Sequence, residues 1–141
     1  MNYLKPLSIL VLFLGIFQAG AQTALNQDMS LKNPDNPAKC KNIREGKFLR
    51  DNYPEGIWYM TIKDNVQTEY FNGGKDFIKS SIVFLDDCNY KTIVIEKTDK
   101  NDPTQIGDVV SNKVVQTEGD YLRIRSKVDN QEIEKKIIKV K

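Results

Sequence analysis

The sequence predicts an all-β fold, an antiparallel up-and-down barrel of about eight strands. Three observations lead to this prediction: short runs in which apolar and polar residues alternate, brief polar turns rich in Asn, Asp and Gly, and no long helical pattern outside the first 21 residues. Short connections favour antiparallel neighbours, and closing eight strands into a barrel removes exposed sheet edges. A two-sheet β-sandwich is the alternative that the same pattern allows.

The predicted strands follow one another from residue 46 to residue 141. The second run shows the pattern most clearly, because Trp58, Met60 and Ile62 alternate with more polar neighbours and so predict one buried face. In the fourth run, Ile78 and Ile82 share a face in the same way. The predicted strands are 46–50, 56–64, 66–71, 77–86, 88–97, 105–117, 121–128 and 132–141.

Turn residues separate these runs. Asp64-Asn65 predicts a tight turn, and Asn72-Gly73 is typical of a type I′ hairpin turn, because both residues accept positive φ angles. Asp86-Asp87 predicts the next turn, and Gly107 predicts a bend within the run at 105–117. A single helical turn is predicted just before the first strand.

The N-terminal segment has the layout of a secretory signal peptide over residues 1–21. Lys5 precedes a short apolar run, and Ala19-Gly20-Ala21 offers a small-residue cleavage site. The apolar run is shorter than the roughly 20 residues that span a bilayer. We therefore expect an exported protein, periplasmic or extracellular, with no permanent membrane span after cleavage. Residues 22–39 are predicted to be a flexible leader, and residues 40–141 a single domain.

Cys40 and Cys88 are the only cysteines of the chain. In an oxidising compartment such a lone pair tends to form a disulfide. Because Asp86 and Asp87 precede Cys88, a reactive thiol or a metal corner is the competing interpretation. Neighbouring carboxylates disfavour a thiolate, however, and zinc needs several Cys or His ligands. The disulfide is therefore the favoured prediction.

The composition argues against several classes of function. The chain has no histidine, the commonest general base and metal ligand, and no pair of carboxylates stands out as catalytic. We expect no enzymatic activity, no cofactor and no metal. Removing Lys5 with the signal peptide leaves 20 basic and 19 acidic residues, a net charge of +1. A nucleic-acid partner is not expected, since it would require a clustered basic surface.

Two resemblances add to this picture. The segment EGKF (45–48), followed by GIWYMTI (56–62), resembles the start of lipocalin-like, calycin-type barrels, although Phe48 stands where those barrels often have Trp. The segments CKNIREGKF (40–48) and DDCNYKTIVIE (86–96) resemble small exported proteins of the Bacteroidetes type, some of which are labelled DNA topoisomerase IV. This chain lacks a Gly-rich ATP-binding motif and the size of such an enzyme. The resemblance therefore implies an exported barrel and no topoisomerase activity.

By analogy with such barrels, we expect a non-enzymatic binding module that holds a small apolar ligand. Apolar and aromatic side chains line the interiors of small barrels. The candidate ligand-binding residues are accordingly Trp58, Met60, Ile62 and Tyr90. Packing in a solid core is the alternative role for these side chains. An envelope-associated protein-interaction or inhibitor module is the second hypothesis for function.

Overall fold

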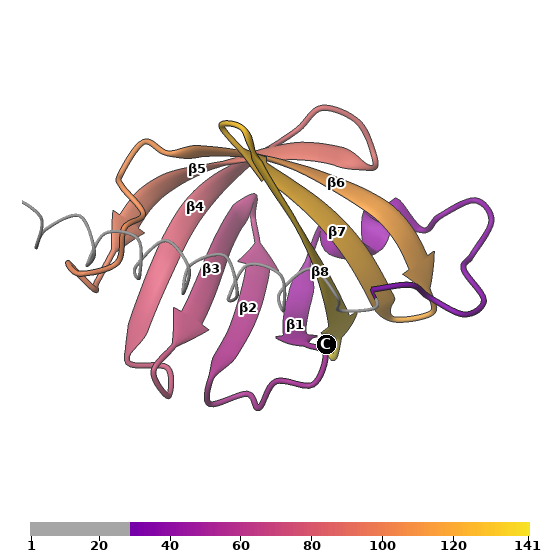
Figure 1. The fold of residues 1–141 in the computed structure, drawn as a ribbon, viewed down its shortest axis with the longest axis horizontal. Helices are drawn as coiled ribbons and strands as arrows, with labels where there is room; N and C mark the ends of the chain where they lie inside the picture. Colours follow the sequence, from indigo (N-terminus) through magenta and orange to yellow (C-terminus); the bar gives the residue numbers. More distant parts are fainter. Residues whose placement is uncertain (1–28) are drawn as a thin grey trace, which may run out of the picture.

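The computed structural model describes residues 29–141, so the predicted signal peptide and the first part of the predicted leader lie outside the described residues. Figure 1 shows one strongly curved sheet that closes on itself, with a short 3-10 helix, η1, beside its last strands. In chain order the elements are η1 (Cys40–Ile43), β1 (Gly46–Arg50), β2 (Trp58–Lys63), β3 (Val66–Phe71), β4 (Asp76–Phe84), β5 (Asn89–Lys97), β6 (Val109–Glu118), β7 (Tyr121–Val128) and β8 (Gln131–Lys139).

The strands form a closed barrel in sequence order. Each strand pairs antiparallel with the next, and β1 pairs with β8, where Phe48 lies opposite Lys139 and Arg50 opposite Ile137. This arrangement confirms the predicted all-β, up-and-down barrel and excludes the two-sheet sandwich. Its strand number and order are consistent with the lipocalin-like fold that the sequence resembles.

The long run predicted at 105–117 begins as a turn instead of a strand. The Asp108 carboxylate accepts a hydrogen bond from the backbone N–H of Gln105 (2.8 Å), and β6 starts only at Val109. Gly107 lies in this turn with a φ of 93°. The irregularity of β6 falls later, between Val114 and Gln116. Local hydrogen bonding by an aspartate therefore ends the strand pattern that alternation alone had extended.

Positive φ angles occur at the predicted tight turns. Asp64 and Asn65 have φ angles of 51° and 59°. Asn72 and Gly73 have φ angles of 55° and 69°, and the N–H of the following residue donates to the Phe71 carbonyl (3.1 Å), as a type I′ turn requires. Residues that tolerate the left-handed region stand where the hairpins need them. Both predicted turns are confirmed.

Helix η1 covers one end of the barrel, which we call the closed end. Cys40 and Ile43 of η1 are buried, and the Cys40–Cys88 disulfide, predicted from the sequence and now confirmed, joins η1 to the connection between β4 and β5. The buried core cluster consists of Cys40, Ile43, Phe48, Met60, Ile62, Ile82, Tyr90, Val114, Leu122, Ile124 and Ile137. Burying a large apolar side chain stabilises a fold by about 1.5–3 kcal/mol. These residues therefore provide much of the stability of the barrel.

Residues 29–39, the described part of the predicted flexible leader, lie against the barrel. The Thr117 hydroxyl, fully buried, donates to the Asp35 carboxylate (2.8 Å) and accepts from the backbone N–H of Lys39 (2.8 Å). The backbone N–H of Asp35 donates to the Thr117 carbonyl (2.7 Å), and Leu31 is buried. The segment has no helix or strand, as its composition indicates, but it is held by specific contacts with the end of β6.

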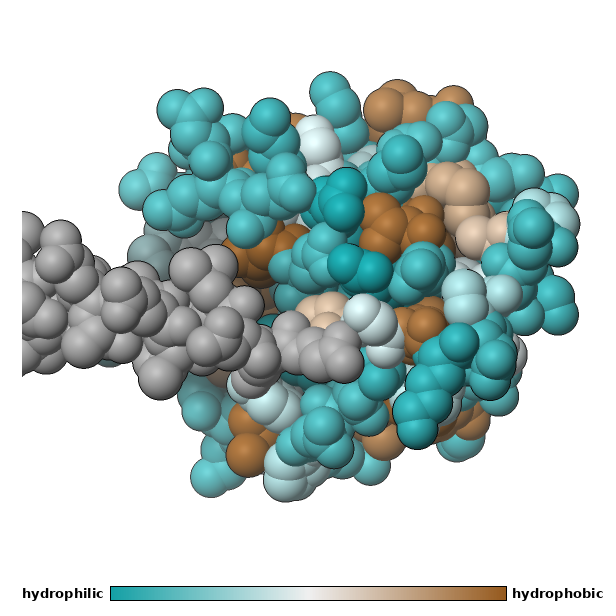
Figure 2. Space-filling model, turned by 45° about the vertical axis from the view of Figure 1, so that its right-hand side comes forward, coloured by the Kyte–Doolittle hydropathy of each residue, from teal (hydrophilic) through white to brown (hydrophobic). Residues whose placement is uncertain are grey.

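The outer surface of the barrel is mostly polar. Figure 2 brings the side of the molecule that carries η1 forward and shows a largely hydrophilic face with small, separate hydrophobic areas. Two arginines of β7 contribute to this surface, since Arg123 and Arg125 both form ion pairs with Glu134 of β8 (2.7 and 3.0 Å). Opposite charges on neighbouring strands thus offset one another across this face.

Candidate functional site

The end of the barrel opposite η1 differs from the closed end, and we call it the open end. Four connections meet there, at residues 51–57, 72–75, 98–108 and 129–130. In Figure 1 the β3–β4 and β5–β6 connections lie on the side of the molecule away from η1. No part of η1 therefore covers the barrel interior from this end.

Six apolar side chains face the interior at the open end, and none of them is buried. Residues opposite each other in a strand pair, and residues two apart on one strand, point to the same side of a sheet. Ile133 lies opposite Ser126, whose side chain is buried, and Trp58 shares a face of β2 with buried Met60. The same reasoning gives a set that we call the cup: Trp58, Phe71, Ile78, Val110, Val128 and Ile133.

The exposure of the cup contrasts with its position inside the barrel. Ile133 is 59% exposed and Val128 is 38% exposed, although both occupy inward-facing positions. At the closed end the equivalent positions of β7 and β8, Leu122 and Ile137, are 0% exposed. Water-exposed apolar side chains on a concave, inward face are typical of ligand sites, because an apolar guest removes them from water. The cup is therefore the candidate functional site.

A pair of opposite charges lies below the cup. Lys135 shares the inward face of β8 with Ile133 and Ile137, and Glu69 shares the inward face of β3 with Phe71. The Lys135 Nζ is 3.8 Å from the Glu69 Oε1, and the two side chains are 15% and 26% exposed. These two largely buried charges thus lie deeper in the barrel than the cup residues, and we call the pair the floor of the cup.

Aromatic side chains surround the floor. The Lys135 Nζ lies 5.9 Å from the centre of the Trp58 ring, a distance at which a cation is attracted by the ring face. Burial raises the pKa of the Tyr90 phenol, and the negative charge of Glu69 raises this pKa further. The phenol therefore stays neutral and can donate or accept a hydrogen bond in the interior.

A short chain of hydrogen bonds runs along the inner wall across three strands. The Ser126 hydroxyl of β7 donates to the Asn112 Oδ1 of β6 (2.6 Å), and the Asn112 amide donates to the Thr92 hydroxyl of β5 (3.4 Å). All three residues are buried. Polar groups buried inside a barrel need such partners. These hydrogen bonds fix the orientation of the Asn112 amide below the cup residues Val110 and Val128.

The four predicted ligand-binding residues all point into the barrel but lie at different depths. Trp58 belongs to the cup, and Met60 lies opposite Glu69, at the level of the floor, with no exposed surface. Ile62 and Tyr90 are buried members of the core cluster. The structure thus brings Trp58 and Met60 to the candidate site, while Ile62 packs deeper.

The sequence prediction did not include Glu69 and Lys135. Lys135 lies midway between Ile133 and Ile137 in an alternating run, so the period of two places a lysine on the apolar face of the last strand. That signal was present in the sequence. Its pairing with Glu69, by contrast, depends on closure of the barrel.

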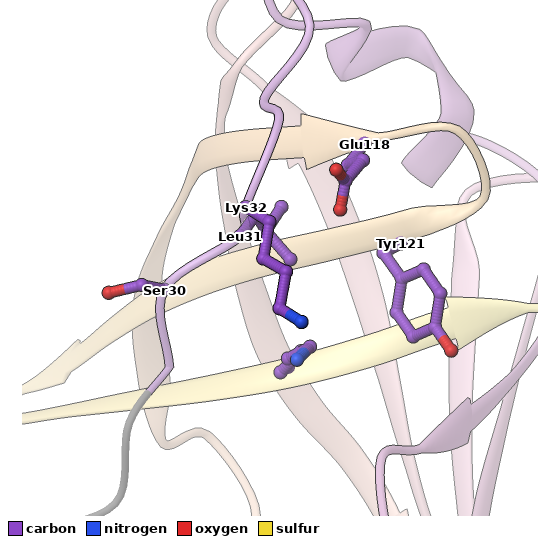
Figure 3. A pocket seen from close by; sticks show the side chains of 6 residues that line it. Ser30, Leu31, Lys32, Glu118 and Tyr121 are labelled. Atoms are coloured by element: carbon purple, nitrogen blue, oxygen red, sulfur yellow. The ribbon is translucent and has the colours of Figure 1, made fainter.

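A hollow lies between the leader and the outer surface of the barrel. It has a volume of about 300 Å³ and is lined by Ser30, Leu31, Lys32, Glu118, Tyr121 and Lys136 (Figure 3). Several of its polar groups already have partners. Glu118 accepts a hydrogen bond from the backbone N–H of Asn33 (2.7 Å), and Lys136 is paired with Asp51 (3.3 Å). This hollow is the space that the docked leader leaves between itself and the strands β6 to β8.

Asp86, Asp87 and Cys88 form a turn, and the disulfide links this turn to η1. The Asp86 carboxylate accepts hydrogen bonds from the Asn89 side chain and from the backbone N–H groups of Cys88 and Asn89, which lower its pKa. Asp87 faces Arg44 (3.3 Å). Within residues 29–141 there is no free cysteine and no cluster of three or more metal-ligating side chains. The competing thiol and metal interpretations therefore find no support in this part of the chain.

No helix among the described residues has the length and apolar character needed to cross a bilayer. The chain matches no protein-family model, and no significantly similar protein was found among curated proteins or among solved structures.

Proposed function

We propose that the protein is an exported, non-enzymatic binding module that holds a small, largely apolar ligand in the cup. The observation that supports this proposal is the partial exposure of six apolar, inward-facing side chains at one end of a barrel whose other end is packed solid. Apolar surface removed from water contributes roughly 25 cal/mol per Å². A guest in the cup gains this contribution without unfolding the core. The disulfide agrees with export to an oxidising compartment.

Titration with a neutral apolar probe tests this function. Trp58 is the only tryptophan of the chain, so its fluorescence reports directly on the cup. N-phenyl-1-naphthylamine is expected to bind with saturation, to quench Trp58 and to gain fluorescence itself. Absence of saturable binding would contradict the proposal.

A matched pair of variants locates the binding. Val128→Asp places a charge in the cup and is expected to weaken probe binding at least ten-fold. Val83→Asp makes the same change on the outer face of β4, where Val83 is 49% exposed and lies opposite Lys91, and it is expected to leave binding unchanged. Equal effects of the two variants would argue against the cup as the site.

A second candidate function, an envelope-associated interaction or inhibitor module, is favoured by a different observation. Aliphatic side chains are exposed on the outer face of β4 to β6, with Val83 and Val109 each about half exposed and Ile93 directly opposite Val109. Native mass spectrometry of the protein purified from its own host separates the two functions. A retained small molecule favours the cup, whereas a retained protein chain that Val109→Lys releases favours the outer face.

A further inference from the structure

The ammonium group of Lys135 donates no hydrogen bond to any described residue. It carries three N–H donors, yet its nearest carboxylate oxygen, on Glu69, is 3.8 Å away, and no described residue offers an acceptor within hydrogen-bond distance. Its side chain is only 15% exposed. Among the described residues no buried side-chain nitrogen or oxygen lacks a hydrogen-bond partner, so this ammonium reaches solvent inside the cup. The floor of the cup thus presents a cation whose donors are available to a guest.

The charges inside the open half do not balance. Arg50 lies on the same face of β1 as buried Phe48, so it is directed inward, and its guanidinium lies 4.8 Å from the centre of the Tyr53 ring. Lys97 and Asp76 occupy the inward positions opposite Ile78 and Phe71. With Arg50, Lys135 and Glu69 they make three positive charges against two negative ones. One additional anion would therefore neutralise the interior, whereas a second cation would add to its charge.

The apolar rim and the cation lie in a fixed order along the strand. Ile133 precedes Lys135 by two residues on the inward face of β8, so its backbone lies about 7 Å farther along the strand toward the open end. The ring of Trp58 lies beside the ammonium group. A guest that matches this order has one acidic group at its inner end and an apolar body that extends toward the mouth.

We propose that the ligand is an amphipathic organic anion, whose acidic group accepts hydrogen bonds from Lys135 while its apolar body contacts Trp58 and Ile133. This inference rests on the proposed function and specifies the chemistry of the guest. Lys135 acts as the residue that selects the acid over an uncharged molecule of the same shape.

The test compares decanoate with 1-decanol, which share an apolar chain and differ in charge. Each is titrated by displacement of N-phenyl-1-naphthylamine from the full-length protein with its disulfide intact. Decanoate is expected to bind at least ten-fold more tightly than 1-decanol. In Lys135→Gln this preference is expected to disappear, with decanoate weakened at least ten-fold and 1-decanol changed less than two-fold. Lys135→Arg is expected to keep the preference.

Lys127→Gln is the matched control, because Lys127 is exposed and points outward from β7. It is expected to leave both affinities unchanged. Equal affinities of the native protein for decanoate and 1-decanol would overturn the inference and leave the proposed function standing. Failure of both molecules and of the naphthylamine to bind would overturn the proposed function itself. Equal weakening of both molecules by Lys135→Gln would show that Lys135 only maintains the shape of the cup, and would also overturn the inference.

Discussion

Lys135 of β8 and Glu69 of β3 meet across the interior of the barrel, with 3.8 Å between Nζ and Oε1, although their strands share no edge. β8 pairs with β7 and β1, and β3 pairs with β2 and β4. Two strands, β1 and β2, lie between β8 and β3, so the ion pair crosses the barrel interior and separates the packed core from the cup. It is a contact that only a closed barrel can make.

The first prediction is that Glu69 and Lys135 stabilise the fold through their contact with each other. Glu69→Gln removes the one carboxylate within 4 Å of the Lys135 ammonium in residues 29–141, and we expect the free energy of unfolding to fall by about 1 kcal/mol, because the pair is partly shielded from water. Lys135→Gln should have an effect of similar size. In the double variant the two effects should not add, and urea denaturation of all four proteins measures the difference. Simple additivity would show that the pair contributes nothing to the barrel.

The disulfide should provide a large part of the stability of the domain. Cys40 and Cys88 are 48 residues apart, and a loop of this length corresponds to roughly 4 kcal/mol in the chain-entropy description. We expect Cys40→Ala/Cys88→Ala to lower the free energy of unfolding by up to this amount in urea denaturation. Mass spectrometry of the protein purified without reductant, compared with a reduced sample, provides the control. Two free thiols in the unreduced sample would contradict the assigned bond.

Gly46, at the start of β1, should not tolerate a side chain. Its φ is 140°, and a Cβ there would collide with the backbone oxygen of Lys141 and approach the Lys139 Cε to 2.8 Å. We expect Gly46→Ala to lower the free energy of unfolding by about 1–3 kcal/mol. Gly56→Ala is the matched control, since nothing lies within 4 Å of its added Cβ. Thermal unfolding compares the two, and similar melting temperatures would refute the steric argument.

The period of two in the sequence was sufficient to predict the barrel. Trp58, Met60 and Ile62 alternate over β2 with little interruption, and each predicted turn carries residues suited to positive φ angles or local hydrogen bonds. The disulfide was predicted from a lone pair of cysteines together with the predicted signal peptide. These features are local or compositional, so they are visible without knowing how distant strands meet.

The candidate site was only partly predictable, because it depends on closure. Trp58 was identified as an inward-facing aromatic residue, and it lies in the cup. Which inward positions remain exposed, however, depends on η1 covering one end and not the other. The Glu69–Lys135 pair requires the register of the whole barrel. The docking of the leader uses the hydroxyl of Thr117 together with backbone contacts to the end of β6, and neither gives a signal in a strand-like sequence.

The Thr117 hydroxyl should hold the leader segment 29–39 against the barrel. Thr117→Val keeps the shape of the buried side chain but removes its hydrogen bonds to Asp35 and to the Lys39 backbone. We expect faster hydrogen exchange at the Lys39 amide and a loss of about 1 kcal/mol in the free energy of unfolding. Thr117→Ser keeps the hydroxyl and should preserve protection of that amide. Unchanged exchange in Thr117→Val would show that Leu31 and its surroundings hold the segment without it.

The ion pairs on the outer face of β7 and β8 should make stability depend on pH in the acid range. Burial opposes ionisation of Glu134, but hydrogen bonds from Arg123 and Arg125 outweigh this effect and hold its pKa below the usual value of 4.5. A carboxyl with a lowered pKa in the folded state stabilises the fold above its unfolded pKa. This stabilisation is lost as the pH falls through the folded pKa.

Glu134→Gln should therefore lower the free energy of unfolding near pH 7 by about 1 kcal/mol, a figure reduced for its 23% exposure to solvent. The gap between native and variant protein should shrink as the pH falls below about 4.5, because protonation removes the same interaction from the native protein. Urea denaturation from pH 7 to pH 3 measures this gap. Glu132→Gln, whose side chain is 53% exposed, should show a much smaller gap at every pH. A gap for Glu134→Gln that stays constant down to pH 3 would mean that the change acts through packing, not through the charge of Glu134.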